Sequence, residues 1–489
     1  MNLALLIIYG AALTFVFIYS FVQLSLVWNY AKVSKTKKNV SLKENDNWPK
    51  VTIQLPIFNE KYVVQRLIQN IAQLDYPENL LEIQILDDSN DETTKIVKEC
   101  VDELPNKKIF KLIRRPERNG YKAGALKYGL QSAKGEFIAI FDADFLPQKD
   151  FLLKTIPYFF ESEHTGVVQT KWGHINKDYN LLTKCQAFGL NAHFTVEQTG
   201  RNSADHFINF NGTGGVWRRK CIEDAGNWQA DTLTEDLDLS YRAQLKGWKF
   251  KYLEEIESPA ELPVTMTALK SQQFRWTKGA AENTRKNLMK VFKHELPLTT
   301  KIHSLFHLMN SFIFICVLIC SFLSVPILWI KVNYLEYNLL FKLSSVFILS
   351  LMILYAFYFT SYFRDHAFSI KSLIRFTCAF PIFLSLSMGL GIHNSIAVFE
   401  GLIGKKSPFV RTPKFNITAK NKSWKKNVYR MRSIGLLTTL EGLSSLYFLF
   451  GILLSIYLED YTMIYLETLL FLGYFGVFYF SVKHALVDA

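Results

Sequence analysis

FIAIFDAD, residues 137–144, is an apolar run that ends in two carboxylates. A short, continuous apolar run followed by turn residues predicts a strand that is buried on both faces. An earlier run, Leu81–Leu86, ends in the same way at Asp87-Asp88. Because ligands bind beyond the carboxyl ends of the strands in parallel α/β sheets, these carboxylates mark the candidate site.

The segments around these two runs alternate between strand-like and helix-like patterns. The expected strands are Val51–Leu55, Leu81–Leu86, Ile109–Ile113 and Phe137–Phe141, and the expected helices are Tyr62–Leu74, a segment through Ile96 and Val97, and Lys122–Ser132. Strands that alternate with helices indicate βαβ units. The sequence therefore predicts an α/β domain with a mainly parallel sheet.

Asp142 and Asp144 have the spacing of a divalent-cation site. Two carboxylates at the end of a buried strand supply hard oxygen ligands, and the cation that they hold can bridge a diphosphate. One Asp-x-Asp alone more often forms a turn, but Asp87-Asp88 provides a second acidic strand end. The turn at residues 118–124 is basic and rich in glycine, which suits phosphate contact. The alternative for its Lys122 is an ordinary solvated lysine at a helix start.

Three later segments combine polar and aromatic residues. The turn Asn211–Arg218 is rich in glycine and flanked by aromatic rings, so it suits an acceptor sugar or is a tight turn packed by those rings. Thr234-Glu235-Asp236 opens a helical pattern, where the acids either complement the helix dipole or supply a catalytic base. Gln272–Trp276 precedes a basic stretch and alone predicts an interfacial helix.

The composition excludes several classes of protein. Hydrophobic residues make up 49% of the 489 residues and aromatic residues 15%, which excludes a disordered chain and a small disulfide scaffold. Six cysteines occur without a CxxC pair, so reduced, buried thiols are expected. The net charge of +13 suits nucleic acid or the basic cytoplasmic loops of a membrane protein, and its distribution favours the membrane.

Several apolar runs approach or exceed the roughly 20 residues that span a bilayer. They are Leu3–Trp28, Ser304–Ile330, Leu343–Phe363, Phe376–Phe399, Ser433–Leu458 and Tyr461–Phe480. Four lysines within residues 32–38 follow the first run, so the positive-inside rule places its C-terminal end in the cytoplasm. Glu441 and Glu467 lie in the last two runs, where a carboxylate is expected near a helix end, in the protein interior or on a polar path.

The run Phe376–Phe399 conflicts with a simple count of crossings. The segment Lys405–Arg432 contains ten Lys or Arg and no acid, so it is expected in the cytoplasm. Two spans before the run already return the chain to that side. Pro381, Gly389 and Gly391 interrupt the run, which predicts a bent, re-entrant or hairpin segment, with an interfacial helix as the alternative.

The order of these motifs resembles the processive family 2 glycosyltransferases of the cellulose synthase superfamily. The motifs that carry the resemblance are Pro56 with Asn59-Glu60, Asp87-Asp88, Asp142-x-Asp144, Thr234-Glu235-Asp236 and Gln272-Gln273-x-Arg275-Trp276. Four further motifs are most similar to the cellulose-synthase-like A and C groups, which make β-mannan, glucomannan and β-glucan backbones. These motifs are Lys171-Trp172, Phe194-x-Val196-Glu197-Gln198, Phe210–Thr213 and Gly247–Phe250. The likeness covers about Val51 to Thr284 in detail, and the rest mainly by layout.

This resemblance implies a fold and a layout of domains. A cytoplasmic GT-A (Rossmann-like) glycosyltransferase domain, residues 45–295, is expected between an N-terminal transmembrane helix at 1–30 and a C-terminal α-helical transmembrane region at 300–489. The basic loop at 404–432 contains Phe415-x-x-Thr418-x-Lys420, which looks like the gating loop of cellulose synthases, with Ile417 in place of valine. An anionic-lipid-binding loop is the alternative for this basic segment.

The resemblance also implies roles for individual residues. The general base would be Asp236, and the ligands of Mg²⁺ or Mn²⁺ would be Asp142 and Asp144. The residues that bind the donor would be Pro56, Asn59, Glu60, Asp87, Asp88, Lys122 and Asp142. The acceptor site and channel mouth would be lined by Gly212, Thr213, Glu235, Gln272, Gln273, Arg275 and Trp276, and the gating loop would contain Phe415, Thr418 and Lys420.

These expectations define one function. The protein is expected to be a multi-pass protein of the plasma or inner membrane that polymerises a β-linked glucan, mannan or glucomannan from a UDP- or GDP-sugar with inversion. Its partners would be the donor, the growing glycan and membrane lipids, with an unknown export partner and no nucleic acid. The alternative is a non-processive transferase that adds a sugar from a UDP-sugar to a membrane lipid.

Overall fold

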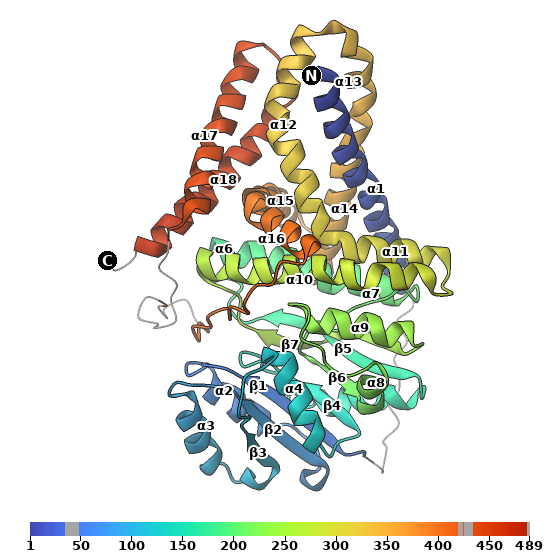
Figure 1. Ribbon diagram of the computed structural model, residues 1–489, viewed down its shortest axis with the longest axis vertical. Coiled ribbons are helices and arrows are strands. Elements are labelled where there is room, and N and C mark those ends of the chain that lie inside the picture. Colours follow the sequence, from blue (N-terminus) through green and yellow to red (C-terminus); the bar gives the residue numbers. More distant parts are fainter. Residues whose placement is uncertain (35–47, 419–423, 425–433, 487–489) are drawn as a thin grey trace.

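The computed structural model describes residues 1–34, 48–418, 424 and 434–486 of the chain. A sheet domain lies at one end and long apolar helices lie at the other (Figure 1). Between them lie α6 (Leu181–Ala192), α10 (Met266–Lys293) and α11 (Leu298–Leu308), whose axes run across the molecule (Figure 1). The candidate site therefore lies close to the base of the helical end.

Seven strands form one mixed sheet in the described part of the chain. They are β1 (Val51–Ile57), β2 (Leu81–Asp87), β3 (Phe110–Ile113), β4 (Phe137–Ile140), β5 (Thr165–His174), β6 (Gly215–Arg218) and β7 (Lys249–Ala260), in the order β3-β2-β1-β4-β6-β5-β7. β6 alone runs antiparallel to both its neighbours. The predicted α/β fold is confirmed. The sequence patterns did not predict β5, β6 or β7. The residues of β6 lie in a segment that reads as a glycine-rich turn.

Each face of the sheet has its own apolar core, because side chains alternate along a strand. In β4, Phe137 and Ala139 pack into one buried cluster, whereas Ile138 and Ile140 pack into the other. The surrounding helices are α2 (Val64–Ile71), α3 (Thr93–Asp102), α4 (Tyr121–Ser132), α5 (Phe151–Thr155), α7 (Gln198–Asn202), α8 (Arg219–Asp224) and α9 (Glu235–Leu245). Burial on both faces explains why this strand reads as a continuous apolar run.

Among the described residues, six helical segments are long and apolar enough to cross a membrane. They span Asn2–Val33, Leu298–Asn333, Leu335–Asp365, Ile370–Gly389, Leu436–Tyr457 and Ile464–Leu486. They include α1 (Asn2–Ser34), α12 (Ile313–Asn333), α13 (Asn338–Ser344), α14 (Ile348–Asp365), α15 (Ile370–Gly389), α17 (Leu436–Tyr457) and α18 (Ile464–Leu486). A multi-pass arrangement is consistent with these lengths.

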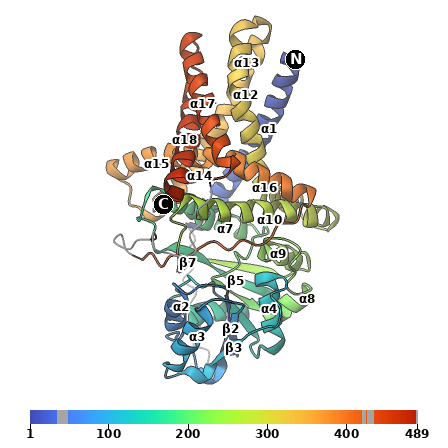
Figure 2. The same ribbon diagram turned by 60° about the vertical axis from the view of Figure 1, so that its left-hand side comes forward.

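The bend predicted within Phe376–Phe399 is confirmed. α15 ends at Gly389 and a separate helix, α16 (Gly391–Ile403), begins at Gly391. Both views show this pair at the base of the bundle, near α10 and crossing the direction of α12 and α17 (Figures 1 and 2). Gly389 packs against the backbone of Gly473 in α18, where a Cβ would lie 2.3 Å from the Gly473 carbonyl oxygen. Close helix packing therefore requires glycine at the end of α15.

The two acidic residues of the last helices are both buried in protein. Lys270 of α10 donates a hydrogen bond to Glu441 Oε2 at 2.6 Å and to Ser481 Oγ at 2.9 Å. Ser324 of α12 donates to Glu467 Oε1 at 2.5 Å. Buried carboxylates are stable only when they are paired or hydrogen-bonded, so these contacts tie α17 and α18 to the rest of the structure.

Candidate active site

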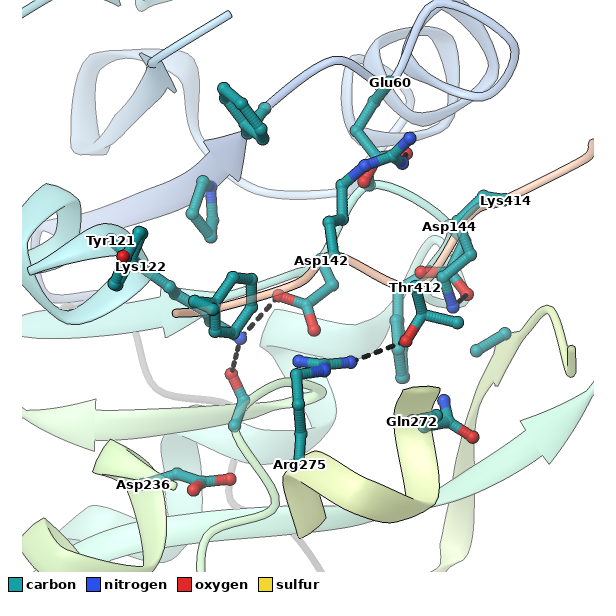
Figure 3. Close-up of a pocket in the computed structure, with 18 of the residues that line it drawn as sticks. Glu60, Tyr121, Lys122, Asp142, Asp144, Asp236, Gln272, Arg275, Thr412 and Lys414 are labelled. Carbon is teal, nitrogen blue, oxygen red and sulfur yellow. Dashed lines mark hydrogen bonds and ion pairs between the residues drawn. The ribbon is translucent and has the colours of Figure 1, made fainter. Parts of the chain in front are cut away.

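A pocket of about 190 Å³ opens at the carboxyl ends of β1, β2 and β4, beside α10 (Figure 3). Most of the predicted site residues line it. These are Pro56, Glu60, Asp88, Lys122, Asp142, Asp144, Gly212, Glu235, Asp236, Gln272, Arg275 and Trp276. The structure therefore brings together motifs that are spread over more than 200 residues of the chain.

Lys122 connects two walls of the pocket. Its Nζ donates to Asp142 Oδ1 at 2.5 Å and to the Gly212 carbonyl oxygen at 2.9 Å (Figure 3). Gly120 supplies the left-handed backbone before α4, with φ of 71°, that aims this lysine inward. Burial lowers the pKa of Lys122, but the charges of Asp142 and Glu235 raise it above the usual value in net. Lys122 is therefore a fixed positive charge, and the solvated-lysine alternative is wrong.

Asp236 lies in the first turn of α9, in the wall opposite Lys414 (Figure 3). Burial, with the neighbouring charge of Glu235 as a second cause, raises the pKa of Asp236 to about 7. Gly212 has φ of 79°, and a Cβ on it would lie 2.9 Å from Asp236 Oδ2. The positive φ favours glycine here, and a Cβ would displace this carboxylate, which has the environment of a general base that works near neutral pH.

Helix α10 supplies the wall between the sheet domain and the apolar helices. Arg275 donates from Nη2 to Thr412 Oγ1 at 2.7 Å and lies over the ring of Phe409, 4.7 Å from its centroid. Trp276 and Trp172 face the pocket with ring centroids 6.4 Å apart. α10 therefore presents a guanidinium and an indole to any bound substrate, and the indole is suited to stack on a sugar.

A basic loop contributes residues to the pocket that the sequence patterns, for the most part, did not predict. In the described loop 404–418, Arg411 Nη1 lies 2.6 Å from Glu60 Oε2, and Lys414 Nζ donates to Asp144 Oδ2 at 2.7 Å. The ring of Phe409 stacks on Tyr121, with centroids 5.5 Å apart. These residues had one sequence signal, the ten Lys or Arg between residues 405 and 432, and it identifies neither their partners nor their position.

The two aspartates fit a divalent cation that also binds a diphosphate. Asp142 Oδ1 accepts from Lys122, and Asp144 Oδ2 accepts from Lys414 and from the Glu261 backbone N–H at 3.0 Å. The second oxygen of each carboxylate has no hydrogen bond within the described residues. No group of three His, Cys, Asp or Glu in that part of the chain could hold a metal by itself. Two carboxylates with phosphate oxygens form the usual Mg²⁺ site.

Some predicted residues lie outside the pocket lining. Asp87 accepts hydrogen bonds from Thr94 Oγ1 at 2.5 Å and from the Ser89 N–H at 2.9 Å, so its carboxylate is used within the turn after β2. Asn59 pairs with Asn90 on the surface. We find no donor-binding position for either side chain, because both are already engaged in local contacts.

Five further predicted residues also lie outside the lining or outside the described chain. Thr213 is buried beneath the pocket, where its Oγ1 accepts from the Asp142 N–H at 2.9 Å. Gln273 does not line the pocket. Phe415 is buried, and its N–H donates to Glu261 Oε1 at 2.9 Å; Thr418 is exposed. Lys420 lies outside the described residues.

Comparison with known proteins gives consistent results. Residues 49–279 match the family described as Glycosyltransferase like family 2. The chain is 41% identical over 294 residues to a probable glucomannan 4-beta-mannosyltransferase 4 from Oryza sativa subsp. japonica, covering 57% of this chain and 54% of that one. It is 40% identical over 298 residues to glucomannan 4-beta-mannosyltransferase 9 from Arabidopsis thaliana, covering 58% and 56%. The chain thus spans about half the length of the curated relatives it matches.

The fold also matches a solved structure. The mannosyltransferase PcManGT from Pyrobaculum calidifontis, in complex with GDP-Man and Mn²⁺, aligns with a TM-score of 0.56 over 83% of this chain and all of that chain. The sequence identity is 18%, so this likeness concerns the fold alone. It confirms the α/β fold, and the sequence match supports the resemblance to glycosyltransferases.

Proposed function

We propose that the chain is a membrane-embedded, inverting glycosyltransferase that polymerises a β-linked mannan or glucomannan, because residues 49–279 match Glycosyltransferase like family 2. One observation carries this proposal: Asp236, Asp142, Asp144 and Arg275 line a single pocket next to the apolar helices. We assign the catalytic domain to residues 45–295, and we place it in the cytoplasm because the adjoining loops are basic.

The reaction would be one in-line displacement. Asp236 takes the proton from the attacking hydroxyl of the acceptor sugar, and that oxygen forms a bond to the anomeric carbon of the donor. The bond between this carbon and the diphosphate oxygen breaks, and the nucleoside diphosphate leaves. A single displacement turns an α-linked donor into a β-glycoside, so one base is sufficient.

The positive groups of the pocket would stabilise the departing diphosphate. Lys122 and Arg275 both line it, and fixed positive charges in a site shielded from water stabilise charge that develops on a leaving group. Asp142 and Asp144 would hold Mg²⁺ or Mn²⁺, which neutralises phosphate charge when it is bound. The sequence relatives carry the name mannosyltransferase, and the solved structure of the same fold holds Mn²⁺ and GDP-Man, so we propose GDP-mannose as the donor.

The acceptor would enter from the side of α10, where Trp172 and Trp276 line the pocket. Aromatic rings bind the apolar faces of sugars, and the apolar helices begin beyond this wall (Figure 2). We propose that the growing glycan leaves toward the membrane along this side, among lipids and with any export partner still to be identified. The helix pair α15–α16 at the base of the bundle would form part of the exit.

The test uses membranes that contain the full chain. They are incubated with labelled GDP-mannose or UDP-glucose and with Mg²⁺ or Mn²⁺, and the product is separated into ethanol-insoluble polymer and organic-soluble lipid. We expect label from GDP-mannose in polymer that a β-mannanase releases. Label only in the lipid fraction would contradict polymerisation and support transfer to a lipid acceptor.

A further inference from the structure

A buried polar network lies behind the glycine-rich turn of the pocket. His193 and Glu197 belong to a π-helical turn, η4 (His193–Glu197), and His193 Nδ1 lies 2.9 Å from Glu197 Oε2. Arg201, which is only 1% exposed, donates to Glu197 Oε1 from Nε and Nη2 at 3.1 and 3.0 Å. Turns of this kind are rare and occur mostly at functional sites.

The charges within this network are fixed. Burial by itself would raise the pKa of Glu197, but His193 and Arg201 lower it well below its usual range. Glu197 is therefore a carboxylate, and it holds His193 by one ring nitrogen. The other ring nitrogen, Nε2, lies 3.2 Å from Asn211 Oδ1. The network thus ends on a side chain of the pocket wall.

The side-chain oxygen and the backbone N–H of Asn211 are hydrogen-bonded, whereas its side-chain nitrogen has no partner among the described residues. Its Oδ1 accepts from Asn209 Nδ2 at 2.8 Å and from Gln198 Nε2 at 3.3 Å, besides its contact with His193. Its backbone N–H donates to Gln169 Oε1 at 3.0 Å. The amide nitrogen Nδ2 is buried and has no hydrogen-bond partner among the described residues, although Asn211 lines the pocket. A buried donor without a partner costs free energy, so a ligand atom is the natural partner.

The position of Asn211 indicates which substrate it meets. The next residue, Gly212, lies against Asp236 and accepts a hydrogen bond from Lys122. Asp236 must lie beside the attacking hydroxyl if it is the base, so Asn211 is on the acceptor side of the reacting carbon. Its free N–H group needs an acceptor atom, which a sugar hydroxyl oxygen provides.

We propose that Asn211 donates a hydrogen bond from Nδ2 to a hydroxyl oxygen of the acceptor sugar, and that His193 is the positioning residue that fixes the amide. The inference rests on the proposed function and deepens it, because it assigns an acceptor contact. Turning the amide by half a rotation would place Oδ1 toward the sugar and lose the donors of Asn209 and Gln198. The network therefore specifies a donor at this position.

The first experiment compares Asn211→Asp and Asn211→Ala in the full chain in lipid nanodiscs. The donor is the one that labels product in the assay above, and the acceptor is a β-linked oligosaccharide of the same sugar. Asp keeps an oxygen for His193 but has no N–H. We expect both variants to raise the KM for the oligosaccharide about tenfold, which is typical of one lost hydrogen bond. The Kd for the nucleotide sugar should not change, which also shows that the variants are folded.

A matched control removes an amide elsewhere. Asn106 donates to the Ala72 carbonyl oxygen at 3.1 Å and does not line the pocket, so Asn106→Asp should leave both constants unchanged. An unchanged acceptor KM in Asn211→Asp would overturn the proposal. An equal loss of nucleotide-sugar affinity would also overturn it, because Asn211 would then contact the donor.

The second experiment tests His193 by chemical rescue. His193→Gly leaves a space that free imidazole can fill, since this side chain is 28% exposed. We expect a raised acceptor KM that falls again when imidazole is added, and no such effect in the surface control His164→Gly. Failure of imidazole to restore the KM would show that His193 has only a structural role. A wild-type protein that transfers no sugar would instead contradict the proposed function.

Discussion

Asp142 and Asp144 are two residues apart in the sequence, but the lysines that pair with them come from two different regions of the molecule. Lys122 belongs to the sheet domain and is only 20 residues from Asp142. Lys414 belongs to the loop 404–418 and is 270 residues from Asp144. The first pair persists wherever the sheet domain is folded. The second pair exists only while the loop lies across the pocket.

The two lysines therefore differ: the charge of Lys122 is fixed within the sheet domain and is called the permanent charge below, whereas the charge of Lys414 depends on the position of the loop. Lys414 occupies one oxygen of Asp144, where a divalent cation would bring its own positive charge. The loop is also held by the ion pair between Arg411 and Glu60 and by the hydrogen bond that Arg275 donates to Thr412. We therefore expect variants in the sheet domain to affect the chemical step, and variants in the loop to affect the occupancy of the site.

The largest effect is expected for Asp236→Asn, which tests whether the chemistry belongs to the sheet domain. Loss of a general base should lower the rate of sugar transfer by about 10²–10⁴. The measurement is the initial rate at saturating donor, with the Kd for the nucleotide sugar as a check that the fold is intact. A rate close to that of the wild type would mean that the base lies elsewhere, for example in the loop.

The permanent charge is tested by Lys122→Met. Removing a fixed positive group beside the diphosphate should lower kcat by about 10²–10³. Lys127→Met is the matched control, because Lys127 lies on the same helix and is exposed. If Lys122→Met changed only the KM for the donor, Lys122 would bind the ground state and not stabilise the leaving group.

The pH dependence sharpens the comparison further. Asp236 must be unprotonated to act as a base, and its pKa is raised to about 7, first by burial and then by the charge of Glu235. The kcat/KM should therefore fall about tenfold for each pH unit below this value. Glu235→Gln removes the second cause and should move the midpoint to lower pH. A profile with no change between pH 5 and 8 would argue against Asp236.

The smallest effect on rate is expected for Lys414→Met. It should change kcat only a few-fold, because Lys414 pairs with Asp144 and lies on the side of the pocket away from Asp236 (Figure 3). The affinity for Mn²⁺, measured by electron paramagnetic resonance without donor, should rise because the competing ammonium is gone. Lys406→Met in the same loop is exposed and should behave like the wild type. Weaker Mn²⁺ binding in Lys414→Met would mean that the two cations do not compete.

Local patterns predicted the sheet domain but not every side chain of the site. The strand ends and the helix starts could be predicted, because burial and chain reversal both produce residue patterns that extend over only a few positions. Asp87 and Asp88 show the limit of this approach. Neighbouring residues at a strand end point to opposite sides, and the structure turns Asp87 toward Thr94 and Asp88 toward the pocket. The sequence Asp87-Asp88 alone does not reveal which of the two carboxylates faces the pocket.

The loop contacts could not be predicted for a different reason. The pairing of Lys414 with Asp144, or of Arg411 with Glu60, depends on how the apolar helices return the chain to the sheet domain. Hydrophobic periodicity reports how an element is buried and not which distant charge it meets. The resemblance correctly placed a loop near the site, but it named Phe415 and Thr418, which do not line the pocket.

The distance of 270 residues between Asp144 and Lys414 also sets an order in time. A ribosome that adds about 5–20 residues per second completes the last strand of the sheet, at Ala260, roughly 7–30 seconds before it reaches Phe409. During that interval the first half of the protein holds the proposed base and the two proposed metal ligands, but its pocket lacks the wall that residues 409–414 provide. The pocket is therefore completed last on the side of the loop, after most of the apolar helices have been made.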